Sequence, residues 1–444
     1  PAAGYDFGTL LPTGIEKIEL LRSSNSTIWG SQAIGGVLAA QTRFTSGVEG
    51  SVEYGARDTL YATLGAGTEV DALELAADGA WYRTDGFSAA AVGTEPDGYR
   101  QWQAGLRGRL ALAPGLRLRG GIRYADARLD IDGFPPPSYS LADTAEYQET
   151  RQLSTFGGLE YDSDALQLTA GWSASDTERD NFDPALGTGP AYGTQGRSDR
   201  IDLRGGWRLG EATLRFGGES EWARFSSADR EEDARTTGAY AQLGTTIVQD
   251  LSVNAGARIT DHSRFGSAVT FGADAAWALG GGWRVRASFG EGFKSPSLYQ
   301  LFSEYGNLAL EPERSTSADL GIELNDRNSA THFAVTLFRR DSEDLIDFVS
   351  CFGSTEELCV DRPYGTYDNI GRVRAQGVEI EGRRALTDAL AARLAYSFVD
   401  TENRTAGSPN YGNVLARRPR HALSLGGEWR VTDGGAALGA DLRW

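Results

Sequence analysis

The chain has 444 residues and a formal charge of −18 at pH 7. This charge argues against nucleic acid as a partner, because phosphate binding needs a basic surface. No run of about 18 apolar residues occurs, which excludes a transmembrane helix. Methionine is absent and no signal peptide opens the chain, so we expect a fragment of a longer protein.

The first 44 residues differ from the rest. Residues 15–40 (IEKIELLRSSNSTIWGSQAIGGVLAA) combine a short strand with small residues, including Gly30, Gly35 and Gly36. No GK[ST] follows the glycine pair, so we expect these glycines to serve backbone packing rather than phosphate binding. The segment is either an independent small element or the end of a plug.

From residue 45 to 444 the pattern has a period of two. Residues 166–174 (LQLTAGWSA) and 251–260 (LSVNAGARIT) alternate strictly between apolar and other residues, which indicates strands with one apolar face. The alternating runs last roughly 10–15 residues, enough to cross a bilayer as tilted strands. Aromatic residues near the ends of the apolar faces favour an interfacial girdle; they are Tyr124, Trp172, Trp222, Trp277 and Trp429.

The connections alternate, with two exceptions, between short turns and long segments, the latter including 128–149, 178–197, 291–313 and 341–367. Short turns on one rim and long loops on the other are typical of an outer-membrane barrel. We therefore predict an all-β fold, a transmembrane antiparallel β-barrel. It would hold about 19 strands of a parent of about 22, since bacterial single-chain barrels have even strand numbers. Barrels of that size enclose a wide lumen that needs a plug.

The long loops carry the candidate binding residues. Aromatic side chains with a few polar groups suit a large amphipathic ligand, but they equally suit loops that pack on one another. The candidates are Phe134, Tyr139, Phe182, Tyr192, Tyr299, Phe302, Tyr305, Phe352 and Tyr364.

Other loop residues carry two weaker signals. The acidic runs at 130–133 and 229–233 offer hard oxygen ligands for calcium, but neither follows the EF-hand spacing and solvated loops are the alternative. No other cofactor is indicated. Cys351 and Cys359 share one long loop, and a disulfide is expected if that loop faces an oxidising surface; a reduced pair or a metal site is the alternative.

Four motifs together resemble the TonB-dependent receptor family. Residues 15–37 resemble the end of that family's plug, with Arg22, Gly30, Gly35 and Gly36 in matching places and Ser23-Ser24-Asn25 where the family prefers Gly-Pro. The other three are GEGFKSPSLYQLFSEYGNLALEPERSTSADLG at 290–321, YDNI with QGVEIE at 367–381, and RRPRH at 417–421. They follow the family's order and spacing.

The resemblance implies a transporter in the outer membrane of a Gram-negative bacterium. Its partners would be the lipid bilayer, a TonB-type energy-coupling protein and a bulky extracellular ligand, and the protein would be a monomer. Residues 1–44 would be the C-terminal part of the plug and 45–444 the barrel. The ligand would be a vitamin B12-type corrinoid or a ferric siderophore, with a slight preference for the corrinoid.

The alternatives are a passive porin or surface-adhesion barrel, and an outer-membrane enzyme. A passive porin has no plug-like segment. An enzyme needs a catalytic group set, and no Ser/His/Asp or Cys/His arrangement stands out in the sequence.

Overall fold

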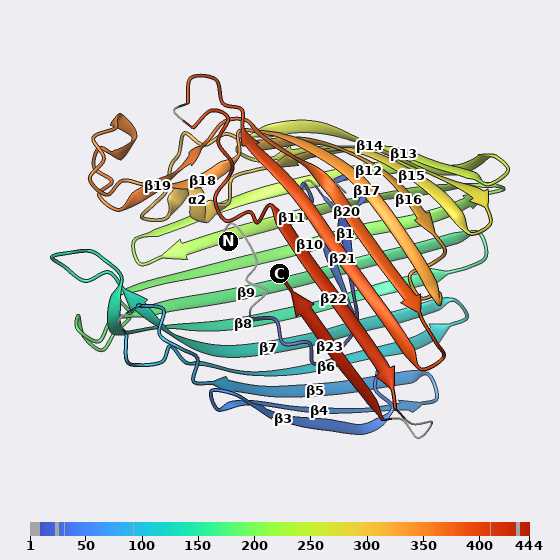
Figure 1. The fold of residues 1–444 in the computed structure, drawn as a ribbon, viewed down its shortest axis with the longest axis horizontal. Helices are drawn as coiled ribbons and strands as arrows, with labels where there is room; N and C mark the ends of the chain where they lie inside the picture. The colour runs from blue at the N-terminus through green and yellow to red at the C-terminus, as the bar shows by residue number, and fades with distance from the viewer. Residues whose placement is uncertain (1–8, 23–25, 31, 92, 409, 432–435) are drawn as a thin grey trace.

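The computed structural model describes residues 9–22, 26–30, 32–91, 93–408, 410–431 and 436–444. Nineteen strands form one antiparallel barrel, in which each strand pairs with the next along the chain and β17 pairs with β20 (Figure 1). The all-β prediction and its strand number are confirmed. None of the helices in these residue ranges is long and apolar enough to span a membrane.

The first ten barrel strands are β3 (Gly47–Gly55), β4 (Thr59–Val70), β5 (Leu73–Thr84), β6 (Tyr99–Ala113), β7 (Leu116–Gly133), β8 (Ala142–Asp162), β9 (Leu166–Phe182), β10 (Tyr192–Leu209), β11 (Ala212–Ser227) and β12 (Arg230–Val248). The other nine are β13 (Leu251–His262), β14 (Gly266–Gly280), β15 (Trp283–Lys294), β16 (Glu313–Leu324), β17 (Thr331–Glu343), β20 (Val373–Ala385), β21 (Leu390–Asn403), β22 (His421–Arg430) and β23 (Ala437–Arg443).

The barrel is polar inside and apolar outside. On β6, Gln103 and Arg107 are only 2% and 6% exposed, whereas Trp102 and Leu106 are 45% and 53% exposed. A soluble sandwich would bury the Trp and the Leu instead. An outer face of exposed apolar side chains requires an apolar surrounding, so the strands are built to stand in lipid.

Several strands are longer than a membrane crossing needs. β8 has 21 residues and β12 has 19, whereas about 9–11 residues cross a bilayer. The excess extends the wall toward the rim that carries the long loops, called here the long-loop rim. The loops of this rim therefore rest on a rigid hydrogen-bonded base.

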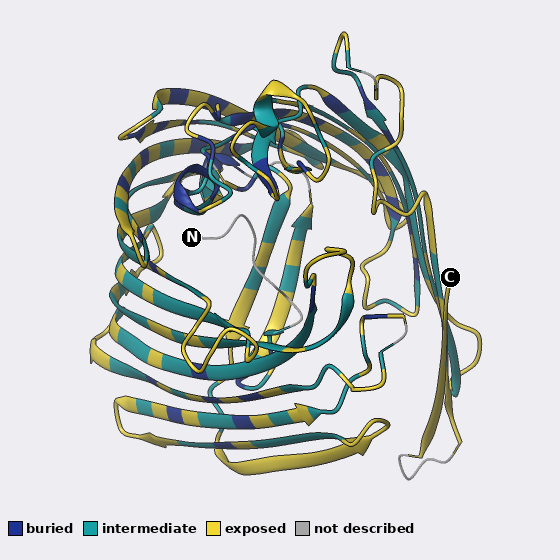
Figure 2. Cartoon of the chain, turned by 90° about the vertical axis from the view of Figure 1, so that its left-hand side faces the viewer, coloured by how far each residue is buried: buried dark blue, intermediate teal, exposed yellow. Residues whose placement is uncertain are grey.

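The N-terminal segment folds inside the barrel. β1 (Ile15–Arg22) and β2 (Gly36–Thr42) form an antiparallel hairpin that lies within the barrel (Figure 2). The short helix α1 (Ser26–Trp29) between them contacts β12–β15. Two wall glycines make room for it: a Cβ at Gly272 would come within 2.6 Å of Thr27 Oγ1, and one at Gly292 within 2.5 Å of Ile34 Cγ2. We call residues 9–22, 26–30 and 32–42 the plug segment, after the expectation that residues 1–44 end a plug, which stays a prediction.

Two long loops fold together over one end of the barrel (Figure 1). The first contains α2 (Leu298–Phe302), and the second contains the hairpin β18 (Ile346–Ser350) and β19 (Gly365–Asn369), with a 3-10 turn at Glu357–Cys359. Their shared apolar core contains Phe225, Ala234, Leu298, Leu301, Phe302, Leu310 and Ile346. We call residues 295–312 and 344–372 the loop cap.

Candidate ligand-binding site

A cavity of about 790 Å³ opens at the long-loop rim, within the usual size range of a ligand pocket. One wall belongs to the loop cap and the opposite wall to the β7–β8 and β9–β10 loops. The cavity is lined by Phe134, Pro135, Pro136, Tyr139, Thr144, Ala145, Glu146, Asp183, Pro184, Ala185, Leu186, Tyr305, Phe348, Phe352 and Tyr364.

The cap wall is held from two sides. Cys351 and Cys359 form a disulfide with Cα atoms 5.3 Å apart, as expected for this pair. The loops that form the cap are also joined by hydrogen bonds, since Asn307 Nδ2 donates to the Tyr367 carbonyl (2.9 Å) and Thr366 Oγ1 donates to the Tyr305 carbonyl (3.1 Å). This wall is thus ordered before any ligand arrives, which lowers the entropic cost of binding.

The opposite wall comes from the run of prolines after β7. Phe134, Pro135 and Pro136 leave the strand, and Tyr139 turns back with a positive φ of 47°. The Tyr139 ring contacts Phe352 across the cavity mouth, with centroids 5.7 Å apart. Apolar side chains from separate loops therefore face one shared space.

These apolar side chains are exposed where no lipid covers them. Phe134 is 59% exposed, Leu186 77% and Phe352 51%. Soluble surfaces rarely gather large apolar groups in this way unless they bind something. The cavity is therefore the candidate site for the apolar surface of a large ligand.

Two carboxylates give the cavity its polar character. Burial, followed by the charge of Asp183, raises the pKa of the Glu146 carboxyl above its usual range. Gly133 makes room for this group, because a Cβ at Gly133 would come within 1.7 Å of Glu146 Oε1. Burial and the nearby Glu304 raise the pKa of Tyr305 to about 12, so its hydroxyl remains a hydrogen-bond donor.

Of the nine aromatic candidates, Phe134, Tyr139, Tyr305, Phe352 and Tyr364 line the cavity. The other four lie elsewhere among the described residues, and a ligand-binding role for them stays a prediction. Phe302 belongs to the loop-cap core, and Tyr299 packs edge-on against Phe225 of that core. Phe182 stacks on Tyr147 with centroids 4.7 Å apart, and Tyr192 begins β10.

Sequence patterns missed Phe348, Glu146 and Asp183. Phe348 sits in a short strand that the long loop hides, and its ring contacts Tyr305 with centroids 5.6 Å apart. Glu146 directly precedes Tyr147, and Asp183 directly follows Phe182; both carboxylates lie in acidic stretches. The proline run beside Phe134 was the available signal that this loop holds a fixed shape.

The plug motif residues make specific contacts. Arg22 forms ion pairs with Glu379 and with Glu381 on β20, the latter with Nη2 and Oε1 2.6 Å apart. The Gly35 carbonyl accepts a hydrogen bond from Arg340 Nη2 at 3.0 Å. Gly36 has a φ of 139° and Gly30 a φ of 104°, which favour glycine. We call Arg22, Glu379 and Glu381 the plug latch.

A second cavity of about 630 Å³ lies between the plug segment and the wall of β14–β17 and β20. Its charged lining includes Arg286, Asp319 and Glu323 besides the plug latch. A polar space therefore runs beside the latch within the barrel.

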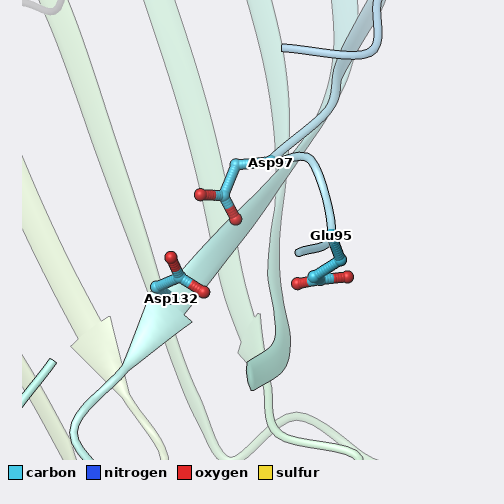
Figure 3. Close-up of side chains that lie close together, drawn as sticks. All are labelled: Glu95, Asp97 and Asp132. Carbon is cyan, nitrogen blue, oxygen red and sulfur yellow. The ribbon is translucent and has the colours of Figure 1, made fainter. Parts of the chain in front are cut away.

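The acidic run at 130–133 lies close to other carboxylates. Asp132 at the end of β7 lies beside Glu95 and Asp97 of the β5–β6 loop, each offering an oxygen within 4.8 Å of the others (Figure 3). Burial raises the pKa of Glu95 and of Asp97. In the other run, Glu231 pairs with Arg224 at 3.3 Å, as in a solvated loop. Calcium binding in these loops stays a prediction.

The chain is similar to proteins of known class. Residues 130–444 match the family model described as TonB dependent receptor-like, beta-barrel. The siderophore receptor PirA from Pseudomonas aeruginosa shares 16% identity over 95% of this chain and 81% of that one, with a TM-score of 0.72. A variant of the ferric enterobactin receptor PfeA from the same species shares 18% identity over 97% and 72%, with a TM-score of 0.79.

The copper transporter OprC shares 15% identity over 97% of this chain and 72% of that one, with a TM-score of 0.79. Identities this low establish the fold alone. The family model covers well over half of the chain, and the barrel it describes is the one observed. The chain therefore belongs to the TonB-dependent receptors.

Proposed function

We propose that this protein imports a bulky metal-bearing nutrient, a ferric siderophore or a corrinoid, across the outer membrane with energy from a TonB-type coupling protein. TonB-dependent receptors are transporters and not enzymes. The observation that carries the proposal is the exposed aromatic cavity above a barrel whose lumen holds the plug segment.

The cavity supplies recognition. Its volume of about 790 Å³ suits a ligand of several rings or a folded metal chelate. The proteins of similar structure include two siderophore receptors and a copper transporter. We infer from this likeness that a metal-bearing ligand is the best candidate here too.

The plug segment supplies gating. It is held to the wall by the plug latch and by Arg340. A passive porin or an adhesion barrel has no need for such an attachment, which disfavours that alternative. Passage through the barrel requires these contacts to break, and the coupling protein would supply the energy.

Uptake measurements test the proposal. The gene encoding this chain is expressed in a strain that lacks its own receptors, and uptake of ⁵⁵Fe-siderophores and ⁵⁷Co-cobalamin is measured with and without a protonophore. We expect uptake of one ligand class that the protonophore abolishes. Uptake that persists with the protonophore would show passive transport, and uptake of neither class would reject both ligands.

A further inference from the structure

We propose that the aromatic cavity selects ligands that carry a net positive charge. This inference rests on the proposed function and narrows its substrate class. It starts from the chemistry of the fifteen lining residues, two of which are acidic, Glu146 and Asp183. None of these described lining residues is Lys, Arg or His.

The surroundings strengthen the negative charge. Thr144, a lining residue, donates its backbone N–H to Asp132 Oδ1 at 3.2 Å. Asp132 in turn lies beside Glu95 and Asp97. A group of carboxylates therefore lies behind the cavity wall. An anionic ligand that enters the cavity would be repelled by several of them.

Two nearby arginines are engaged outside the cavity lining. Arg128 lies over the Tyr147 ring at 3.7 Å and its Nε donates to Asp130 at 3.0 Å. Arg362 is close to the wall in sequence, but its Nη1 donates to Thr366 Oγ1 at 3.1 Å inside the loop cap. Neither guanidinium is among the groups that line the cavity.

The aromatic lining favours the same ligand charge. The faces of aromatic rings attract cations, and several rings around one cavity are the usual means of holding an ammonium group. Tyr139, Phe348, Phe352 and Tyr364 are each 43% exposed or more, so their faces are available. Carboxylates and ring faces together match a large metal complex with a cationic arm.

A charge series on one scaffold gives the test. The ferric complex of a linear trihydroxamate with a free amine carries one positive charge; its N-acetyl derivative is neutral and its N-succinyl derivative is negative. Aquo- and cyanocobalamin give a second pair, one cationic and one neutral. Binding to cells that express the protein is measured in the cold, and uptake is measured at growth temperature.

The protein should bind the trihydroxamate series or the cobalamin pair. Within the series that it binds, we expect the cationic form to bind about tenfold more tightly than the neutral form, a difference of about 1.4 kcal/mol. The negative form should bind most weakly, and added salt should compress the order. The double variant Glu146→Gln, Asp183→Asn should bind the cationic, neutral and negative forms with equal affinity.

The matched control is the double variant Asp164→Asn, Glu211→Gln. It makes the same change in net charge at exposed turns of the opposite rim and should retain the order. Amounts of folded protein in the outer membrane are compared for every variant.

Equal affinity for all charges, or preference for the negative form, overturns the inference, and so does an order that survives the Glu146 and Asp183 changes. Binding by neither scaffold overturns it as well. Protonophore-sensitive uptake without charge order leaves transport standing and rejects the charge preference alone. Charge-ordered binding without energy-dependent uptake supports the preference and rejects the proposed transport.

Discussion

Removal of the Arg22 side chain should loosen the plug segment. Arg22 makes two ion pairs with β20, to Glu379 and Glu381, and its side chain is 44% exposed. A partly exposed pair contributes about 0.2–1 kcal/mol after screening and side-chain entropy. Two pairs that share one guanidinium then contribute about 1 kcal/mol, a factor of about five in the equilibrium between attached and detached plug.

The rate at which a buried thiol is labelled reports this equilibrium. Ala33 of the plug segment is 7% exposed, so Ala33→Cys reacts with a maleimide only when the segment leaves the wall. Arg22→Ala should raise the labelling rate about fivefold. Glu379→Gln should raise it less, and adding it to Arg22→Ala should change little, because the two residues form one interaction.

Lys17→Ala is the matched control. Lys17 lies on the same strand, but its ion pair at 2.6 Å is to Glu19 of that strand and crosses to no wall residue. If Lys17→Ala accelerates labelling as much as Arg22→Ala, or if the Arg22 and Glu379 effects simply add, the latch argument is wrong.

Three further outcomes follow from the cavity and its cap. Replacing Cys351 and Cys359 by Ser should leave the barrel folded but raise the protease sensitivity of the loop and weaken ligand binding severalfold, because the wall is no longer stiffened. Phe302→Ala should destabilise the loop cap by about 3–5 kcal/mol, seen as faster hydrogen exchange there, whereas Phe182→Ala, outside the cap core, should not. Since burial and Asp183 raise the pKa of Glu146, its charge is present above that pKa and lost as pH falls through it; affinity for a cationic ligand should fall over the same window, and Glu146→Gln should abolish this part of the pH dependence.

The barrel could be predicted because its signal is local. Alternation places Trp102 and Leu106 on one face and Gln103 and Arg107 on the other, whatever the strands pair with. The number of strands followed from counting such runs. Partners distant in sequence leave no such trace: Glu379 and Glu381 share one strand face by their spacing, but nothing local connects them with Arg22, more than 350 residues earlier.

The loop residues were harder because a loop's own fold decides which aromatics remain free. Phe302 was expected at the ligand and is buried in the loop cap. One local signal was available: Ser297 and Gln300 form a capping box that starts α2, with the Ser297 N–H donating to Gln300 Oε1 at 2.9 Å. A helix there turns Leu298, Leu301 and Phe302 to one side, which predicts their burial rather than exposure.

We expect ligand binding at the cavity to leave the strength of the plug latch unchanged, although β20 connects the two sites. β20 begins just after the cap hairpin and carries the latch carboxylates, with Glu379 ten residues beyond Asn369, about 33 Å along an extended chain. The junction is fixed to the β21–β22 loop, since Thr405 Oγ1 donates to the Ile370 carbonyl at 2.8 Å and accepts from the Arg372 N–H at 2.9 Å.

We therefore expect a shift of the cap on ligand binding to be absorbed before it reaches Glu379. Distant sites without shared partners usually add within about 0.3–0.5 kcal/mol. The labelling ratio between Arg22→Ala and the parent Ala33→Cys protein should then be the same, within about twofold, with and without saturating ligand. A ratio that ligand changes tenfold would require β20 to carry the signal, and Thr405→Ala should then alter that ratio.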